Sequence, residues 1–95
     1  MADRTMLTVY CYDIADARTR AKVAALLERK AVRVQESVFE TRLTRAAADR
    51  LYWRVTGLMD TTDMLRMYAI GKAGLERCRS HGGAPIAEEG DFWIV

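Results

Sequence analysis

The sequence predicts a small α+β domain in which two helices cover one face of an antiparallel β-sheet. Three observations lead to this fold class. The hydrophobic period switches between two and about 3.6 residues, the elements run strand, helix, strand, helix, strand, and all of them fit within 95 residues. A chain of this length forms one domain, residues 1–95, and buries only about 60 to 65% of its unfolded surface. We therefore expect it to associate into an oligomer.

The composition indicates a soluble, cytoplasmic protein. Hydrophobic residues make up 51% of the chain and charged residues 29%, as in ordinary globular domains. No apolar run approaches the ~20 residues of a membrane helix, and the N-terminus lacks the order of a signal peptide. The two cysteines, Cys11 and Cys78, match no metal-binding spacing. We expect no membrane association and no metal site built on cysteine.

The first element is a strand over residues 6–13. Its side chains alternate with a period of two, which is typical of a half-buried strand. The strand ends on an acid, Asp13, and a helix that contains several arginines is predicted to begin a few residues later. A carboxylate at the end of an apolar strand needs a physical reason. The two faces of the strand are Leu7, Val9, Cys11 and Asp13 on one side, and Thr8, Tyr10 and Tyr12 on the other.

A helix follows from Asp16 to about Lys30. Asp16 is a suitable N-cap, because its carboxylate can accept hydrogen bonds from the first free N–H groups of the helix. The apolar side chains Val23, Leu26 and Leu27 lie on one side of this segment, whereas most of the cations lie outside that side. This helix is expected to pack on the sheet.

The period returns to two over residues 32–43, "VRVQESVFETRL". The valines point one way, and Arg33, Gln35, Ser37 and Phe39 point the other. Glu36 on the valine side suggests a bend. The pattern is consistent with one kinked strand or with two short ones.

A second helix and a further strand complete the predicted sheet. Thr44 caps the helix and Gly57 is its expected C-terminal stop. Residues 61–70 form the strand, residues 72–90 are polar and turn-rich, and residues 91–95, "DFWIV", form a short apolar strand. The expected buried stripe of the second helix is Ala47, Leu51, Val55 and Leu58.

These elements predict a ferredoxin-like sandwich with an extra C-terminal strand. Two helices can cover only one face of the sheet. We expect the other face to carry Thr8, Tyr10, Tyr12 and Phe39, which are too apolar to be left to water. That face should meet either a second copy of the sheet or nucleic-acid bases that stack on its aromatic rings.

The net charge is only +2, but its distribution is uneven. Residues 18–54 contain ten lysines and arginines against four acids, a local excess of +6. Such a stretch attracts phosphates when its cations share a face, although it is more often a solvated helical surface.

Three motifs carry a resemblance to a known family. They are "YDI" at 12–14 followed by an acid and a basic helix, "RVQESVFE" at 33–40, and "DMLRMYAI" at 63–70. In this order and spacing the chain resembles the CRISPR-associated protein 2 family, the small subunit of the CRISPR spacer-acquisition machinery. The resemblance covers Val9 to Ile70.

The resemblance implies a function that composition alone does not show. Members form homodimers through their sheet faces, and C-terminal strands often dock on the partner's sheet. The dimer bridges subunits of the CRISPR-associated protein 1 integrase and helps to hold duplex prespacer DNA. Several members also resemble metal-dependent nucleases of RNA or double-stranded DNA. A structural adaptor and a nuclease therefore both remain open, and a ferredoxin-like single-strand RNA-binding module without catalysis is the third alternative.

The resemblance also implies the site. Asp13 is the expected catalytic and metal-binding residue, with one Mg²⁺ shared between the Asp13 carboxylates of two subunits. This ion needs only one or two carboxylates beside water and phosphate oxygens. Asp13 as a simple strand-to-helix turn residue is the structural alternative. Arg20 is expected to be catalytic and to bind nucleic acid, Arg33 is expected to bind nucleic acid, and Tyr12, Ser37 and Phe39 are expected to shape the site or an interface.

Overall fold

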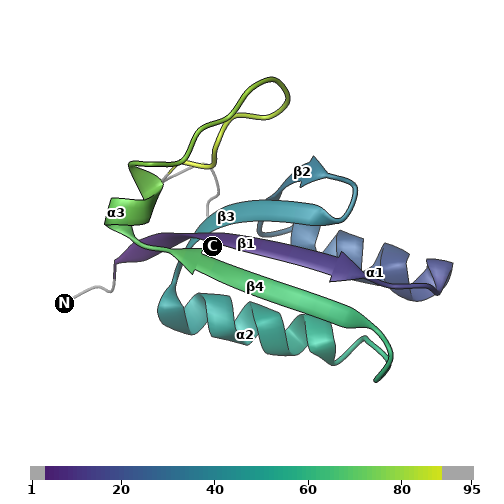
Figure 1. The fold of residues 1–95 in the computed structure, drawn as a ribbon. Coiled ribbons are helices and arrows are strands. Elements are labelled where there is room, and N and C mark those ends of the chain that lie inside the picture. Colours follow the sequence, from purple (N-terminus) through teal and green to yellow (C-terminus); the bar gives the residue numbers. More distant parts are fainter. Residues whose placement is uncertain (1–3, 89–95) are drawn as a thin grey trace.

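The computed structural model describes residues 4–88 of the chain (Figure 1). The expected C-terminal strand, residues 91–95, lies outside the described residues. The elements in chain order are β1 (Thr5–Asp13), α1 (Ala17–Glu28), β2 (Val32–Gln35), β3 (Val38–Thr44), α2 (Arg45–Thr56), β4 (Met64–Ile70) and the short α3 (Lys72–Leu75).

The four strands form one antiparallel sheet in the order β2-β3-β1-β4. The two helices α1 and α2 lie on one side of this sheet, and α3 with the loop after it lies on the other (Figure 1). This arrangement confirms the predicted ferredoxin-like α+β fold. None of the helices within residues 4–88 is long and apolar enough to cross a membrane.

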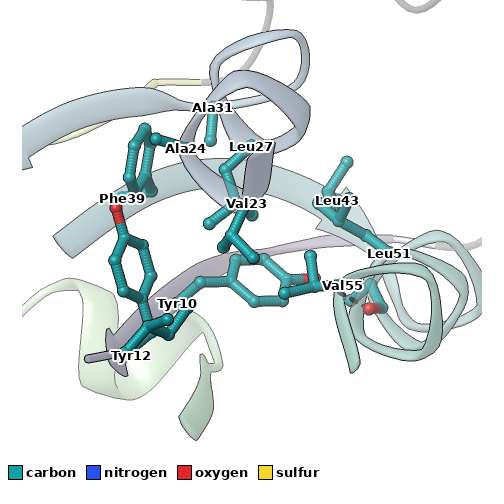
Figure 2. Close-up of a cluster of buried hydrophobic side chains, with 12 residues drawn as sticks. Tyr10, Tyr12, Val23, Ala24, Leu27, Ala31, Phe39, Leu43, Leu51 and Val55 are labelled. Carbon is teal, nitrogen blue, oxygen red and sulfur yellow. Dashed lines mark hydrogen bonds between the residues drawn. The ribbon is translucent and has the colours of Figure 1, made fainter. Parts of the chain in front are cut away.

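The predicted assignment of the two sheet faces is wrong. Thr8, Tyr10, Tyr12 and Phe39 do not form the open face, because all four are at most 4% exposed. The three aromatic rings belong to the main hydrophobic cluster, with side chains from α1 and α2 packed around them (Figure 2). The aromatic platform expected for stacking bases is therefore part of the core.

The tyrosine hydroxyl groups explain how these residues fit beneath the helices. Tyr10 Oη donates a hydrogen bond to the Ala48 carbonyl of α2 at 2.7 Å, and Tyr12 Oη donates to the Glu36 carbonyl at 3.3 Å. A buried hydroxyl without a partner would be costly, and both of these have one.

The face of the sheet without α1 and α2 is called the open face below. It carries the other half of β1, and the strand register places residues of β3 and β4 beside it. Leu7 on this face is only 2% exposed, whereas Asp13, Met64 and Tyr68 are exposed. The residues of the open face are Thr5, Leu7, Val9, Cys11 and Asp13 of β1, Val38, Glu40, Arg42 and Thr44 of β3, and Met64, Arg66, Tyr68 and Ile70 of β4.

The helix starts agree with the prediction and the ends differ slightly. Asp16 and Thr44 cap α1 and α2 with their side chains, and Gly57 is the C-cap of α2. The first helix ends at Glu28 rather than near Lys30. Because α2 ends at Thr56, Leu58 falls beyond it and is 41% exposed, so its expected place in the buried stripe is wrong.

Residues 32–43 form two strands rather than one kinked strand. A turn at Glu36–Ser37 joins β2 to β3, and the pairing register shifts between Arg33 and Gln35. The bend suggested by Glu36 is thus a reversal of the chain, and it brings this turn to the end of β1.

Candidate functional site

Four of the predicted site residues line one open pocket beside the first turns of α1. They are Tyr12, Arg20, Arg33 and Ser37, and the pocket has a volume of about 510 Å³. We call it the turn pocket, because the Glu36–Ser37 turn forms one wall. The structure therefore brings together residues that are up to 25 positions apart in the sequence.

The turn is fixed to the end of β1 by hydrogen bonds to its backbone. The Tyr12 N–H donates to the Ser37 carbonyl at 3.2 Å. The Glu36 carbonyl accepts from both Tyr12 Oη at 3.3 Å and Arg33 Nε at 3.1 Å. Sequence reasoning treated Glu36 only as a bend. The structural role of Glu36 comes from its backbone carbonyl, and the pattern of side chains in a sequence cannot predict the partners of a backbone carbonyl.

Phe39 packs against two residues of the turn pocket but does not itself line it. Its ring is fully buried, with its centroid 6.2 Å from that of Tyr12 and the two planes 25° apart. The Arg33 guanidinium carbon lies 5.2 Å from the centroid of the Phe39 ring, which is a cation–π contact. Phe39 thus packs against both Tyr12 and Arg33, and its site-shaping role stays a prediction.

Arg20 is held at the start of α1 by the loop that follows β1. Its Nη1 donates to the Ile14 carbonyl at 3.0 Å and to the Ala15 carbonyl at 3.2 Å. Asp16 fixes the same turn, because its Oδ2 accepts from the N–H of Thr19 at 2.8 Å and from the Thr19 hydroxyl at 3.0 Å. These hydrogen bonds from Thr19 lower the pKa of the Asp16 carboxyl.

Both arginines keep donors for a ligand. Arg33 Nη1 forms an ion pair with Glu28 Oε1 at 3.1 Å, and its Nε is bound to the turn. Within residues 4–88, however, Nη2 of Arg33 and both Nε and Nη2 of Arg20 have no hydrogen-bond partner. Guanidinium N–H groups held in this way suit the charge-assisted binding of phosphate oxygens.

Asp13 lies apart from the turn pocket. The alternation of β1 directs Tyr12 toward the helices and Asp13 toward the open face, where it is exposed opposite Met64 of β4. The part of the chain that the structure describes shows no ion pair between Asp13 and Arg20. The predicted catalytic pair is therefore not in direct contact in the described chain, although Arg20 donates to the carbonyls of Ile14 and Ala15, which directly follow Asp13.

The predicted metal site at Asp13 can be tested against the carboxylates that the described residues place around it. Among residues 4–88 there is no group of three or more His, Cys, Asp or Glu side chains suited to hold a metal ion. Asp13 of one chain would offer Mg²⁺ one exposed carboxylate, and Asp13 of a second copy facing it would offer another. This donor set fits Mg²⁺, which binds one or two carboxylates and keeps several waters.

The sequence matches one protein family. Residues 6–78 match the family described as CRISPR associated protein Cas2. The CRISPR-associated endoribonuclease Cas2 2 of Synechocystis is 36% identical over 87 residues, covering 90% of this chain and 94% of that protein. The CRISPR-associated endoribonuclease Cas2 of Mycobacterium tuberculosis is 34% identical over 88 residues, covering 93% of this chain and 78% of that protein.

Solved structures show the same fold. Streptococcus pyogenes Cas2 superimposes with a TM-score of 0.68 at 31% identity, covering 81% of this chain and all of that one. A chain of a partial Cas6-RT-Cas1–Cas2 complex superimposes with a TM-score of 0.69 at 26% identity, covering 95% of this chain and 99% of that one.

Proposed function

Because the chain belongs to the family of CRISPR-associated protein Cas2, we propose that it is an adaptor of CRISPR spacer acquisition. In this role it forms a homodimer, associates with a CRISPR-associated protein 1 integrase and binds the backbone of duplex prespacer DNA. The observation that carries the proposal is the turn pocket, in which a fixed turn and a capped helix hold Arg20 and Arg33 with free donors. The similar chain found in a complex named for Cas1 and Cas2 supports the integrase as partner.

The open face supports the homodimer. Val9, Cys11 and Val38 on it are only half-buried, and Met64 and Tyr68 are exposed. Apolar side chains that stay half-buried or exposed on a sheet face left uncovered by α1 and α2 are typical of a protein–protein contact surface. A second copy on this face also covers surface that a chain of 95 residues cannot bury alone.

Binding of the DNA backbone needs positive charge and positioned donors rather than base-reading side chains. Arg20 and Arg33 supply guanidinium groups whose remaining N–H donors have no partner in the described chain. A phosphate oxygen accepting from them gains charge-assisted hydrogen bonds without breaking the contacts that hold the turn. Sequence-independent binding of this kind weakens steeply as salt is added.

Fluorescence anisotropy with a labelled duplex tests the adaptor. We expect Arg20→Gln to weaken duplex binding and to reduce the slope of log affinity against log salt by about 1, because one phosphate contact is lost. Arg45→Gln is the matched control, since Arg45 is an exposed cation at the start of α2, outside the turn pocket. Equal losses in the two variants would contradict a specific role for the turn pocket.

A second candidate function is a Mg²⁺-dependent endonuclease acting on RNA or double-stranded DNA. It is favoured by the exposed Asp13 at the end of β1 on the face where the second copy is proposed to lie. The relatives named endoribonucleases support it. When bound, Mg²⁺ would polarise the scissile phosphate and favour ionisation of an attacking water. The two Asp13 carboxylates would hold the ion, and Arg20 would orient the phosphate and bind its developing charge.

A magnesium titration separates the two functions. If the nuclease operates, the wild-type protein cleaves RNA or duplex DNA with Mg²⁺, and Asp13→Asn abolishes cleavage while duplex binding persists. Asn has almost the same shape as Asp but removes the charge that binds the ion. Equal cleavage by both proteins would rule out Asp13 as the metal ligand. No cleavage by either protein, with normal duplex binding, would leave the adaptor as the function.

A further inference from the structure

A second basic pocket lies at the opposite end of the sheet from Asp13. It has a volume of about 550 Å³ and is lined by the start of β1, by Arg42 of β3 and by the junction of β4 with α3. We call it the Arg42 pocket. Its cations are Arg4, Arg42 and Lys72. Thr5, Arg42 and Ile70 of its lining belong to the open face. Because Thr5 and Asp13 are the two ends of β1, the pocket lies roughly 26 Å along the strand from Asp13, near which the proposed dimer brings its two copies together.

Two polar atoms of the Arg42 pocket have no partner. Thr5 Oγ1 and Arg42 Nε are both shielded from solvent, and neither forms a hydrogen bond within residues 4–88. Buried polar groups are nearly always paired, so two orphans in the lining of one pocket indicate a missing partner. The third such atom, Thr41 Oγ1, lies on the other face of the sheet beside Thr8 and belongs to the core.

The charges around these atoms define the partner. Within the described chain, none of the three cations forms an ion pair. The ion pair between Arg33 and Glu28 lies outside the Arg42 pocket. Glu40, the neighbouring acid on the open face, accepts a hydrogen bond from the Ala87 N–H at 3.5 Å and so meets the segment after α3. A partner that accepts from Arg42 Nε and from the Thr5 hydroxyl beside three cations is favoured when it carries negative charge.

We propose that the Arg42 pocket binds a phosphate group. Its oxygens accept from Arg42 Nε and Thr5 Oγ1 at the base of the pocket, while the exposed Arg4 and Lys72 neutralise its charge from the rim. The phosphate is either the free ion or a phosphodiester of nucleic acid. Only the second source rests on the proposed function, in which it extends the path of the backbone beyond the turn pocket.

Titration of the full-length ¹⁵N-labelled protein with inorganic phosphate at constant ionic strength tests the site, and a duplex titration follows. We expect amide shifts that saturate at residues 4–6, 42 and 70–72. Thr5→Val, which keeps the shape and charge of the site, and Lys72→Gln should each weaken binding about tenfold. Lys22→Gln, which removes an exposed cation of α1, should leave the affinity within about twofold.

The outcomes assign the source or overturn the proposal. Saturable shifts with inorganic phosphate show that the free ion suffices. Shifts at these amides with the duplex alone, lost in Thr5→Val, assign the phosphodiester. The proposal is overturned if neither ligand shifts these amides, or if Thr5→Val and Lys22→Gln behave alike. Saturable shifts with inorganic phosphate in a protein that binds no duplex would show that this site stands although the adaptor fails, and duplex binding without these shifts would show the reverse, so the two failures are distinguishable.

Discussion

At the scale of single residues, the burial of Tyr12 and Phe39 follows from the residues they contact in the fold and not from the sequence pattern. The sequence pattern placed them on the open face, to be covered by a partner, yet Phe39 is fully buried within the chain against Tyr12 and beneath the Arg33 guanidinium. We expect Phe39→Ala to destabilise the protein by about 3–5 kcal/mol, because it leaves a cavity in the core. Tyr12→Phe should cost only about 1 kcal/mol, since it loses one hydrogen bond to the Glu36 carbonyl. Urea denaturation measures both, and a reversed order would contradict the packing role of Phe39.

Asp16 is the residue whose ionisation should be visible in the pH dependence of stability. Its pKa in the folded protein is lowered, first by hydrogen bonds from Thr19, so the ionised carboxylate stabilises the native state. This contribution is present above the unfolded pKa of about 4 and is lost as the pH falls through the lower, folded pKa. We expect Asp16→Ala to lower the melting temperature near neutral pH, with the difference from wild type shrinking below about pH 3.

Asp16→Asn is the control for this effect. Asn caps a helix about as well as Asp but does not titrate, so its melting temperature should approach that of the wild type near neutral pH. A constant difference between wild type and Asp16→Ala down to about pH 2 would show that the charge of the cap is irrelevant.

At the scale of elements, Tyr10 joins β1 to α2. Its hydroxyl donates to the Ala48 carbonyl at 2.7 Å, and burial raises its pKa, with a further contribution from the charge of Asp49. A raised pKa means that the neutral form is favoured in the folded state. The contribution of the buried, neutral Tyr10 to the free energy of unfolding is therefore complete below the unfolded pKa of 10.0. It is lost as the pH rises above that value, because the tyrosine of the unfolded chain then ionises.

Replacing Tyr10 with phenylalanine separates the hydrogen bond from the titration. We expect Tyr10→Phe to lose about 1 kcal/mol of stability near neutral pH, through the missing bond to α2. Above about pH 10 the variant should lose stability less steeply than the wild type, because one titrating group has gone. Denaturation curves at neutral and alkaline pH test this, and parallel losses in the two proteins would place the alkaline sensitivity elsewhere.

The elements also show what a sequence can and cannot predict. The periods of two and 3.6 located the strands and helices, and Asp16 and Thr44 marked both helix starts, because these signals are local. The sheet face beneath the helices was assigned wrongly, because both faces of β1 are apolar and the sequence gives no reason to prefer the correct one. The choice depends on distant partners such as the Ala48 carbonyl, 38 residues from Tyr10.

The candidate site was likewise predicted only in part. The motif resemblance identified Tyr12, Arg20, Arg33 and Ser37, and the structure places all four in the turn pocket. Strand alternation already placed Asp13 and Tyr12 on opposite sides of β1. It did not predict that Arg20 and Arg33 lie on the Tyr12 side, because their positions depend on the packing of α1 and on the Glu36–Ser37 turn. The Arg42 pocket had no sequence signal. It arises from three segments far apart in the chain, and its orphan donors are a property of packing.

For the whole molecule, the proposed homodimer decides whether Asp13 can hold a metal ion. The described residues contain no group of three or more metal-ligating side chains around Asp13, so in the proposed site the second Asp13 carboxylate comes from a copy that faces it across the open face. Val9 lies near the middle of this face, paired with Glu40 on β3 and Tyr68 on β4, and it is only half-buried in the single chain. A charge introduced there would have to be desolvated in the dimer but not in the monomer.

We therefore expect Val9→Lys to shift the protein from dimer to monomer in sedimentation velocity, with its circular dichroism spectrum retained because Val9 lies outside the core cluster. Ala25→Lys places the same charge at an exposed site on α1 and should remain dimeric. Any Mg²⁺-dependent cleavage should disappear in Val9→Lys although Asp13 is intact, since the second carboxylate is lost with the partner. A folded Val9→Lys that remains a dimer would place the interface elsewhere. Cleavage by a monomeric Val9→Lys would show that one Asp13 carboxylate is sufficient.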